Sequence, residues 1–374
     1  MGIRPSRMPG CLSLACAGAI LASLVFAGAL ATASTARRPA ASVVPARAGI
    51  ASAPARMTFI AGATPPATGA EVMVAATNGG SPKPLGRAST AVLSPNGQFV
   101  AAVSPGSGTP PMGSTLVLYR LSQSPATSRR VRSSTGQITI LAWSPDSRWI
   151  AALDGTSLVV IPLKGRARVI ATGTINGASF APTAPDRLVY SKATSLLVSA
   201  TVNLYVVPLS GGRARQVTHD GLSEYPLWGP YGIVFSREAS HTTTSYQLWQ
   251  VRSNGHDLRA LTNVTVTAPF YGLVPVAVSA DGKHLLANLV GNAATEAYAV
   301  DLGAKPLAAR SLGAPGATTI GNALSHDGRV ILLTDGADSA TPGDFSGQSV
   351  EVEPWSGGTP TVLAAHAAFA SWNR

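Results

Sequence analysis

The stretch LSPNGQFVAAVS, residues 93–104, recurs along the chain with small changes. It returns as WSPDSRWIAALD from Trp143, VSADGKHLLANL from Val278 and LSHDGRVILLTD from Leu324. Each copy ends one apolar run in a large residue, passes through Ser-Pro-Asp/Asn-Gly or a relative of it, and begins a second apolar run. Pro at the second turn position and Gly at the fourth suit a type I turn. Each copy therefore predicts two antiparallel strands joined by a tight turn.

A second repeated element counts the modules independently. An apolar run usually followed by glycine occurs seven times, from EVMVAATNGG at Glu71 to SVEVEPWSGG at Ser349. A repeat period of about 40 to 50 residues indicates stacked or circular repeats. Only six internal first strands precede these runs. Their last large residues are Leu93, Trp143, Phe180, Trp228, Val278 and Leu324.

The two ends of the chain supply the missing strand. The sequence finishes in FASWNR, and Trp372 follows Leu324 by 48 residues, close to the preceding spacing of 46. The first module, MTFIAGA from Met57, lacks a first strand. We therefore predict an all-β fold: a seven-bladed β-propeller of four-stranded antiparallel blades, closed by the C-terminal strand completing the N-terminal blade. Closure would remove exposed sheet edges.

The repeat resembles that of the TolB-like (WD-repeat-like) β-propeller family over nearly all of residues 57–374. The matching residues are Trp143 to Asp146, Leu209 to Gly212, Val217-Thr218 and Leu261-Thr262. The best-known members have six blades and an extra N-terminal domain, so the predicted seven blades weaken any transfer of their partner-binding role. Such propellers also gate serine peptidases, but the sequence has no Gly-x-Ser-x-Gly motif and that activity is not implied.

The N-terminus has the layout of a secretory leader. Arg4 and Arg7 precede an apolar run over residues 11–33 that ends in small residues. We expect residues 1–33 to be a signal peptide or an uncleaved N-terminal anchor, 34–56 a disordered Ala/Arg/Pro-rich linker, and 57–374 the propeller domain. Both cysteines, Cys11 and Cys16, lie in the leader. These features predict an extracytoplasmic protein: secreted, periplasmic or membrane-anchored facing outward.

The net charge indicates which classes of binding partner to expect. Six of the 28 basic residues precede Met57, which leaves 22 against 17 acidic residues. This mild excess gives little support for a nucleic-acid partner, and we expect none. The sequence favours a protein or peptide partner, or an anionic envelope polymer. We expect a monomer without a cofactor.

Strand order places the variable loops on one face, together with the connections between blades, and binding residues concentrate in such loops. The alternative is a set of ordinary solvated loops. The candidates for this ligand face are Lys192, His219, Asp220, Glu224, Tyr225, Arg237, His241, Phe270, Tyr271, Asp335 and Asp344.

Basic residues also gather at or before the fourth strands of three consecutive blades. This predicted basic rim could contact an anionic polymer or lipid; the alternative is protection of sheet edges by charge. It comprises Arg129, Arg130, Arg132, Lys164, Arg166, Arg168, Arg213 and Arg215.

No catalytic or metal motif is apparent. The six histidines lack ligand spacing, no calcium loop is present, and no pair of carboxylates can be assigned to acid/base chemistry. The sequence thus predicts a non-catalytic exported scaffold that binds a protein, peptide or envelope polymer, without catalytic or metal residues. The alternative is an enzyme of lactonase or glycan-cleaving type with an axial site. Converging carboxylates on the variable-loop face would favour the enzyme.

Overall fold

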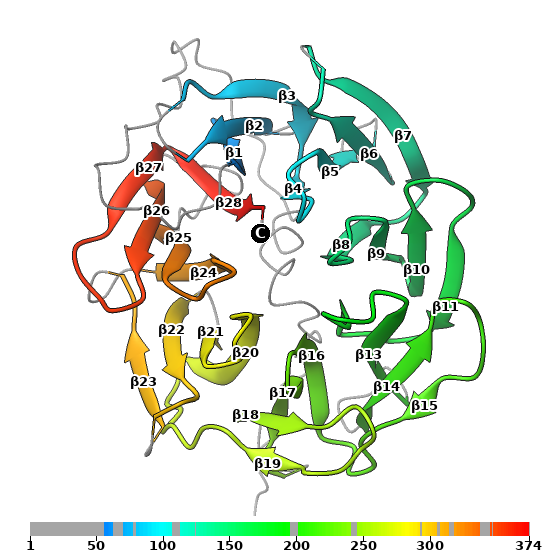
Figure 1. Cartoon of the computed structure of the whole chain (residues 1–374), viewed down its shortest axis with the longest axis vertical. Helices are drawn as coiled ribbons and strands as arrows, with labels where there is room; N and C mark the ends of the chain where they lie inside the picture. Colours follow the sequence, from blue (N-terminus) through cyan, green and yellow to red (C-terminus); the bar gives the residue numbers. More distant parts are fainter. Residues whose placement is uncertain are drawn as a thin grey trace, which may run out of the picture.

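The computed structural model describes residues 56–62, 70–77, 80–106, 113–123, 125–194, 201–240, 245–291, 294–304, 307–313, 318–336, 345 and 347–373. These residues form 28 β-strands and no helix (Figure 1). The strands form antiparallel sheets of four arranged around a ring, as the repeat predicts. The leader and the linker up to residue 55 lie outside the described residues, and the first strand begins at Arg56, one residue before the expected domain start.

Each sheet runs from an inner strand near the ring axis to an outer strand at the rim (Figure 1). Blade 1 contains β28 (Ala367–Trp372), β1 (Arg56–Ala61), β2 (Ala70–Ala76) and β3 (Lys83–Ala88). Blade 2 contains β4 (Thr90–Leu93), β5 (Phe99–Pro105), β6 (Ser114–Arg120) and β7 (Thr127–Ser134). Blade 3 contains β8 (Ile138–Trp143), β9 (Trp149–Asp154), β10 (Ser157–Pro162) and β11 (Arg168–Thr172). Blade 4 contains β12 (Gly177–Phe180), β13 (Arg187–Ala193), β14 (Val202–Pro208) and β15 (Arg215–Gln216).

The remaining strands continue the same order. Blade 5 contains β16 (Ser223–Gly229), β17 (Gly232–Glu238), β18 (Tyr246–Val251) and β19 (Arg259–Ala260). Blade 6 contains β20 (Phe270–Val278), β21 (His284–Gly291), β22 (Thr295–Asp301) and β23 (Ala308–Ser311). Blade 7 contains β24 (Thr318–Leu324), β25 (Val330–Gly336), β26 (Gln348–Pro354) and β27 (Thr361–Ala365). A single parallel bridge between Tyr246 and Gly272 joins blades 5 and 6.

The repeated turn is held by its own polar side chains. In blade 2 the buried hydroxyl of Ser94 donates to Asn96 Oδ1 at 2.7 Å and accepts from the Phe99 amide at 3.0 Å. Gly97 adopts a left-handed φ of 66°. The copies at Ser144, Ser279 and Ser325 repeat these hydroxyl contacts. The same turn residues recur in these copies because each turn needs the same local hydrogen bonds.

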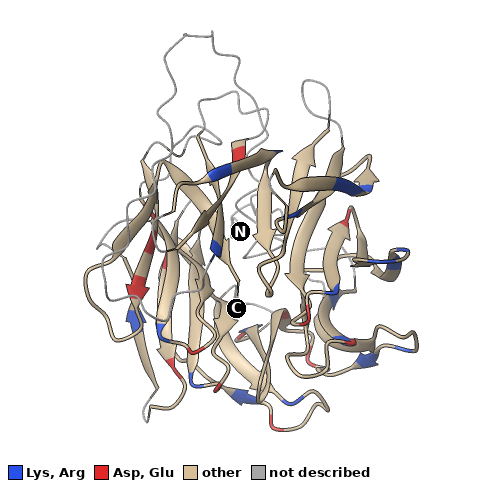
Figure 2. Cartoon of the chain, turned by 45° about the horizontal axis from the view of Figure 1, so that its top comes forward, with Lys and Arg blue, Asp and Glu red and all other residues tan. Residues whose placement is uncertain are grey.

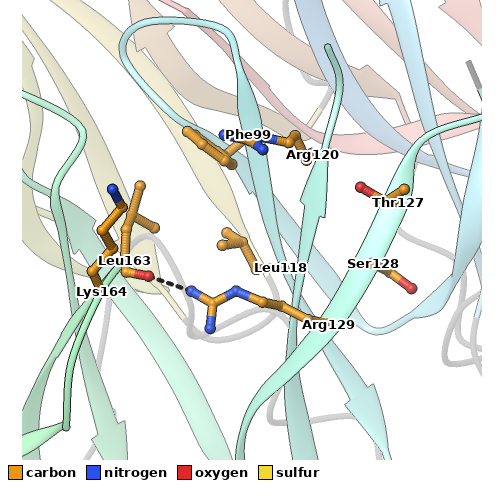
Figure 3. A pocket seen from close by; sticks show the side chains of 8 residues that line it. All are labelled: Phe99, Leu118, Arg120, Thr127, Ser128, Arg129, Leu163 and Lys164. Atoms are coloured by element: carbon orange, nitrogen blue, oxygen red, sulfur yellow. Dashed lines mark hydrogen bonds between the residues drawn. The ribbon is translucent and has the colours of Figure 1, made fainter. Parts of the chain in front are cut away.

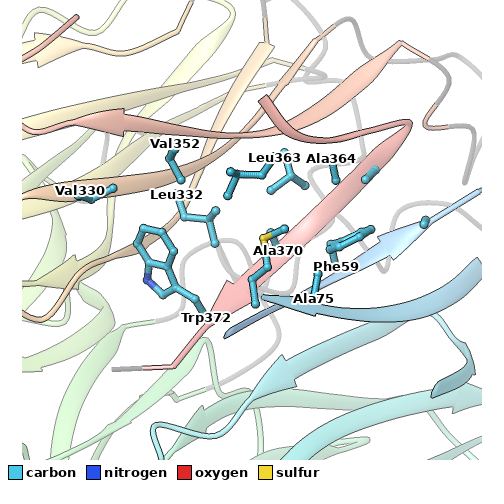
Figure 4. Packing of buried hydrophobic residues seen from close by; sticks show 13 residues of the cluster. Phe59, Ala75, Val330, Leu332, Val352, Leu363, Ala364, Ala370 and Trp372 are labelled. Atoms are coloured by element: carbon cyan, nitrogen blue, oxygen red, sulfur yellow. The ribbon is translucent and has the colours of Figure 1, made fainter. Parts of the chain in front are cut away.

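The core lies between the blades. Within the described residues, seven apolar clusters combine side chains from consecutive blades, and the cluster between blades 1 and 2 also includes Phe345 from the β25–β26 connection. The cluster between blades 7 and 1 contains Trp372, Met57, Leu332 and Val352 (Figure 4). β28 pairs with β1, with Met57 opposite Trp372 and Ala61 opposite Ala367. We interpret these contacts as a ring in which the last strand completes the first blade.

Candidate functional site

The structure brings four predicted ligand-face residues together in blade 5. Asp220 and the inner strand that carries Glu224 and Tyr225 lie beside the end of β17, which carries Arg237. The strand register places Ser223 opposite Arg237. We call this group, together with Asn176, Glu238 and Tyr246, the blade-5 cluster. It lies where the variable loops and blade connections begin, on the face that strand order indicates.

Asp220 and Arg237 form the fixed part of the blade-5 cluster. Arg237 Nε lies 2.7 Å from Asp220 Oδ2, and its guanidinium lies over the Trp249 ring at 4.3 Å from the centroid. Asp220 Oδ1 also accepts from the Leu222 amide and the Ser223 hydroxyl, both at 3.1 Å. Burial alone would raise the pKa of Asp220, but these hydrogen bonds and the Arg237 charge outweigh it and lower that pKa. The pair is therefore ionised and rigidly positioned.

Glu224 forms the titratable part of the cluster. Burial raises the pKa of its carboxyl to about 7, and the negative charge of Glu238 acts in the same direction. Hydrogen bonds from Asn176 and Tyr225 partly oppose this rise. Glu224 is therefore a carboxyl whose charge changes near neutral pH.

Two tyrosines lie near the carboxylates of Glu224 and Glu238. The rings of Tyr225 and Tyr246 meet edge to face at 6.3 Å. Burial, and then the charges of Glu224 and Glu238, raise the pKa of Tyr246, whose hydroxyl donates to Glu238. Tyr246 is therefore neutral, and it can act as a hydrogen-bond donor at this site.

Sequence reasoning missed Asn176, Glu238 and Tyr246. Asn176 is 5% exposed and its Oδ1 has no hydrogen-bond partner among the described residues. Glu238 follows the predicted Arg237 directly and pairs with Tyr246 in the register of β17 and β18. A predicted pairing of the strands β17 and β18 could have identified both Glu238 and Tyr246. Nothing local to Asn176 signals its approach to Glu224 from the preceding blade.

The other predicted ligand-face residues are dispersed. Lys192 lies opposite Asn203 in β13, one residue before the strand ends, and His219 is exposed. Asp335 lies one residue before the end of β25 and accepts a hydrogen bond from Thr319. Phe270 and Tyr271 begin β20, next to Gly272, which forms the bridge to Tyr246. His241 and Asp344 lie outside the described residues.

The backbone of β16 carries a bulge that is a property of the repeat. The register of β16 shifts between Glu224 and Leu227, and Tyr225 has a φ of 49°. Phe369 holds the same place in β28, three residues before Trp372, with a φ of 51°. The inner strands β8, β20 and β24 also shift register. The bulge therefore shapes the crowded inner strands and does not itself indicate a site.

Several residues of the predicted basic rim tie neighbouring blades together. Outer-strand arginines donate to the backbone that follows the third strand of the next blade: Arg129 to the Leu163 carbonyl, Arg168 to Leu209 and Arg215 to Ser253. Arg310 makes the same contact with Trp355. Arg132 pairs with Asp154. Arg130, Lys164, Arg166 and Arg213 are exposed, and Figure 2 shows basic residues on the outer strands and turns.

The described residues contain no group of three or more His, Cys, Asp or Glu side chains that could hold a metal ion. They also include no helix long and apolar enough to cross a membrane.

Comparison with solved structures shows the fold. TolB from Acinetobacter baumannii superposes with a TM-score of 0.51 at 13% identity, covering 85% of this chain and 66% of that one. The β-propeller domain of the Trilobed protease from Pyrococcus furiosus gives 0.60 at 11%, covering 86% and 97%. An oligogalacturonate lyase in complex with manganese gives 0.53 at 15%, covering 84% and 86%. No family model and no curated protein matches the sequence. The chain has a TolB-like β-propeller fold.

Proposed function

We propose that the protein is a non-catalytic scaffold that binds a protein or peptide through the blade-5 cluster. The convergence of Asp220, Glu224, Tyr225 and Arg237 on the variable-loop face carries the proposal. The Asp220–Arg237 ion pair lies next to the carboxylates and tyrosine hydroxyls of the blade-5 cluster. Such groups can bind hydrogen-bond donors and cations. Loop residues on a rigid sheet scaffold commonly serve this purpose.

Selection of displayed peptides against the purified protein tests this proposal. Selected peptides should bind the E238Q and Y246F variants at least about fivefold more weakly, because each substitution removes a charge or a hydroxyl from the blade-5 cluster. R329Q, at a 77% exposed side chain in a turn of blade 7, is the control and should bind normally. Peptides that bind all variants equally would place the binding surface elsewhere.

A specific observation supports an enzyme as the second candidate. Glu224 and Glu238 form an interacting carboxylate pair in which the pKa of Glu224 lies at about 7, and such pairs can divide acid and base roles. A screen against lactones and glycans would test it. An activity that is abolished in both E224Q and E238Q would establish the enzyme and refute the scaffold.

We also propose that the protein is extracytoplasmic and monomeric. The leader-like pattern of residues 1–33 supports export. Cell fractionation and N-terminal sequencing of the mature protein test the first point, and light scattering of the purified protein tests the second. Recovery only in the cytosol, or a mass above that of one chain, would contradict them.

A further inference from the structure

A pocket of about 280 Å³ opens between blades 2 and 3 at the outer part of the ring. Figure 3 shows three cationic side chains turned toward it from two blades. The apolar side chains of Leu118, Leu163 and Phe99 also line it. The lining residues are Phe99, Leu118, Arg120, Thr127, Ser128, Arg129, Leu163 and Lys164.

Strand register explains why these side chains meet. Leu118 lies opposite Arg129 across β6 and β7, and Arg120 lies opposite Thr127 in the same ladder. Arg120 also lies opposite Phe99 across β5 and β6. Residues two apart on a strand face the same side of a sheet, so this whole row faces blade 3. The turn after β10 then supplies Leu163 and Lys164 from the neighbouring blade.

The cations around this pocket lack carboxylate partners. The Arg120 guanidinium lies over the Phe99 ring at 5.7 Å from the centroid, and Arg129 donates to the Leu163 carbonyl. No Asp or Glu occurs in residues 114–132 or 155–176. The ion pairs of the described residues do not include Arg120, Arg129 or Lys164. Their mutual repulsion remains uncompensated by the protein.

The hydrogen bonds by which outer-strand arginines tie neighbouring blades together do not explain why three cations lie at this pocket. Arg129 makes such a tie, as Arg168 and Arg215 do at the next junctions. Arg120 and Lys164 take no part in one, yet both project into the same pocket (Figure 3). These additional cations are not needed for the Arg129 contact, and a bound anion would offset the repulsion among them.

We propose that this pocket binds an anionic group, carboxylate or phosphate, carried on a linear polymer. The forked guanidinium donors of Arg120 and Arg129 match both groups, and Lys164 adds a compact charge. The exposed Arg166 lies on the turn before β11, two residues after Lys164, where it contacts the next charge of the polymer. This site is separate from the blade-5 cluster and does not depend on the function proposed for it.

Binding of the full-length protein to alginate, to inorganic polyphosphate and to neutral dextran tests the proposal. R120Q/K164Q removes two exposed cations and leaves the Arg129 tie in place. We expect at least one anionic polymer to bind the wild type, and this variant to bind it about tenfold more weakly at about 10 mM salt. The difference should disappear at about 1 M salt, where charges are screened within about 3 Å. Dextran should not bind either protein.

The control variant K283Q/R329Q removes two exposed cations from turns of blades 6 and 7. It should bind like the wild type, because its charges lie far from the pocket along the ring. If R120Q/K164Q does not fold, K164Q/R166Q replaces it with a smaller expected loss. Alginate and polyphosphate distinguish a carboxylate from a phosphate ligand.

Three results would overturn the proposal. The first is equal loss of binding in the pocket and control variants, which would indicate net charge alone. The second is binding to vesicles of anionic phospholipid but to neither polymer. The third is unchanged polymer binding by R120Q/K164Q accompanied by self-association, which would show that these charges only protect sheet edges.

Discussion

Replacement of Trp372 by alanine tests whether the last strand holds the ring together. Trp372 is 6% exposed and packs with side chains from both ends of the chain, including Met57 and Leu332. Removing a buried tryptophan side chain costs about 3–5 kcal/mol. Its Nε1 has no hydrogen-bond partner among the described residues, so the substitution also relieves an unpaired donor worth about 1–2 kcal/mol. We therefore expect a net loss of about 3 kcal/mol.

A matched tryptophan in blade 3 makes the comparison sharper. Trp143 is 8% exposed at the corresponding end of β8, and its Nε1 donates to the Val92 carbonyl at 3.1 Å. W143A loses this bond as well as the packing and relieves no unpaired donor, so it should lower the free energy of unfolding by about 2 kcal/mol more than W372A. Y231A, at a 67% exposed ring, should change it by about 0.5 kcal/mol or less.

Urea unfolding followed by far-ultraviolet circular dichroism measures all three variants without relying on tryptophan emission. The decisive quantity is the change in midpoint at constant slope. A loss below about 1 kcal/mol in W372A, together with the full loss in W143A, would show that the C-terminal strand is not an integral part of the fold. It would refute our interpretation of a ring closed between β28 and β1.

Two further predictions concern buried charges. The folded-state pKa of Glu224, about 7, lies above its ordinary value of 4.5, so the stability this carboxyl contributes is present below about pH 4.5 and is lost as the pH rises through 7. E224Q should therefore be more stable than the wild type by about 1–3 kcal/mol at about pH 8 and similar to it at low pH. Urea midpoints that stay parallel for the two proteins across this range would contradict the raised pKa of Glu224. R310A should lower the free energy of unfolding by about 3 kcal/mol, because Glu353 is 3% exposed and its carboxylate would lose its cation; Arg310 Nη1 lies 2.5 Å from Glu353 Oε1. The double variant R310A/E353Q should recover part of this loss. R329A, which opens an exposed pair with Asp327 at 3.9 Å, should cost less than about 0.5 kcal/mol; a similar cost in both arginine variants would remove burial as the cause.

Part of the candidate site could be predicted from the sequence. The choice of Asp220, Glu224, Tyr225 and Arg237 followed from loop placement, which strand order determines. The approach of Asn176 to Glu224 depends on how blades 4 and 5 pack, and the pairing of Glu238 with Tyr246 depends on the β17–β18 register. For the basic rim, the positions of Arg129 and Arg132 were predicted, but their contacts with Leu163 and Asp154 were not.

The repeat, its turns and the sheets of four are readable from the sequence, because these depend on contacts between residues close in the chain. The hydroxyl of Ser94 bonds residues two and five positions later, and its copies do the same. Which charged side chains meet depends on how the sheets pack against one another. Arg120 and Lys164 come from different blades, and so do Asn176 and Glu224; their environments are set by side-chain packing between sheets, which no local pattern encodes.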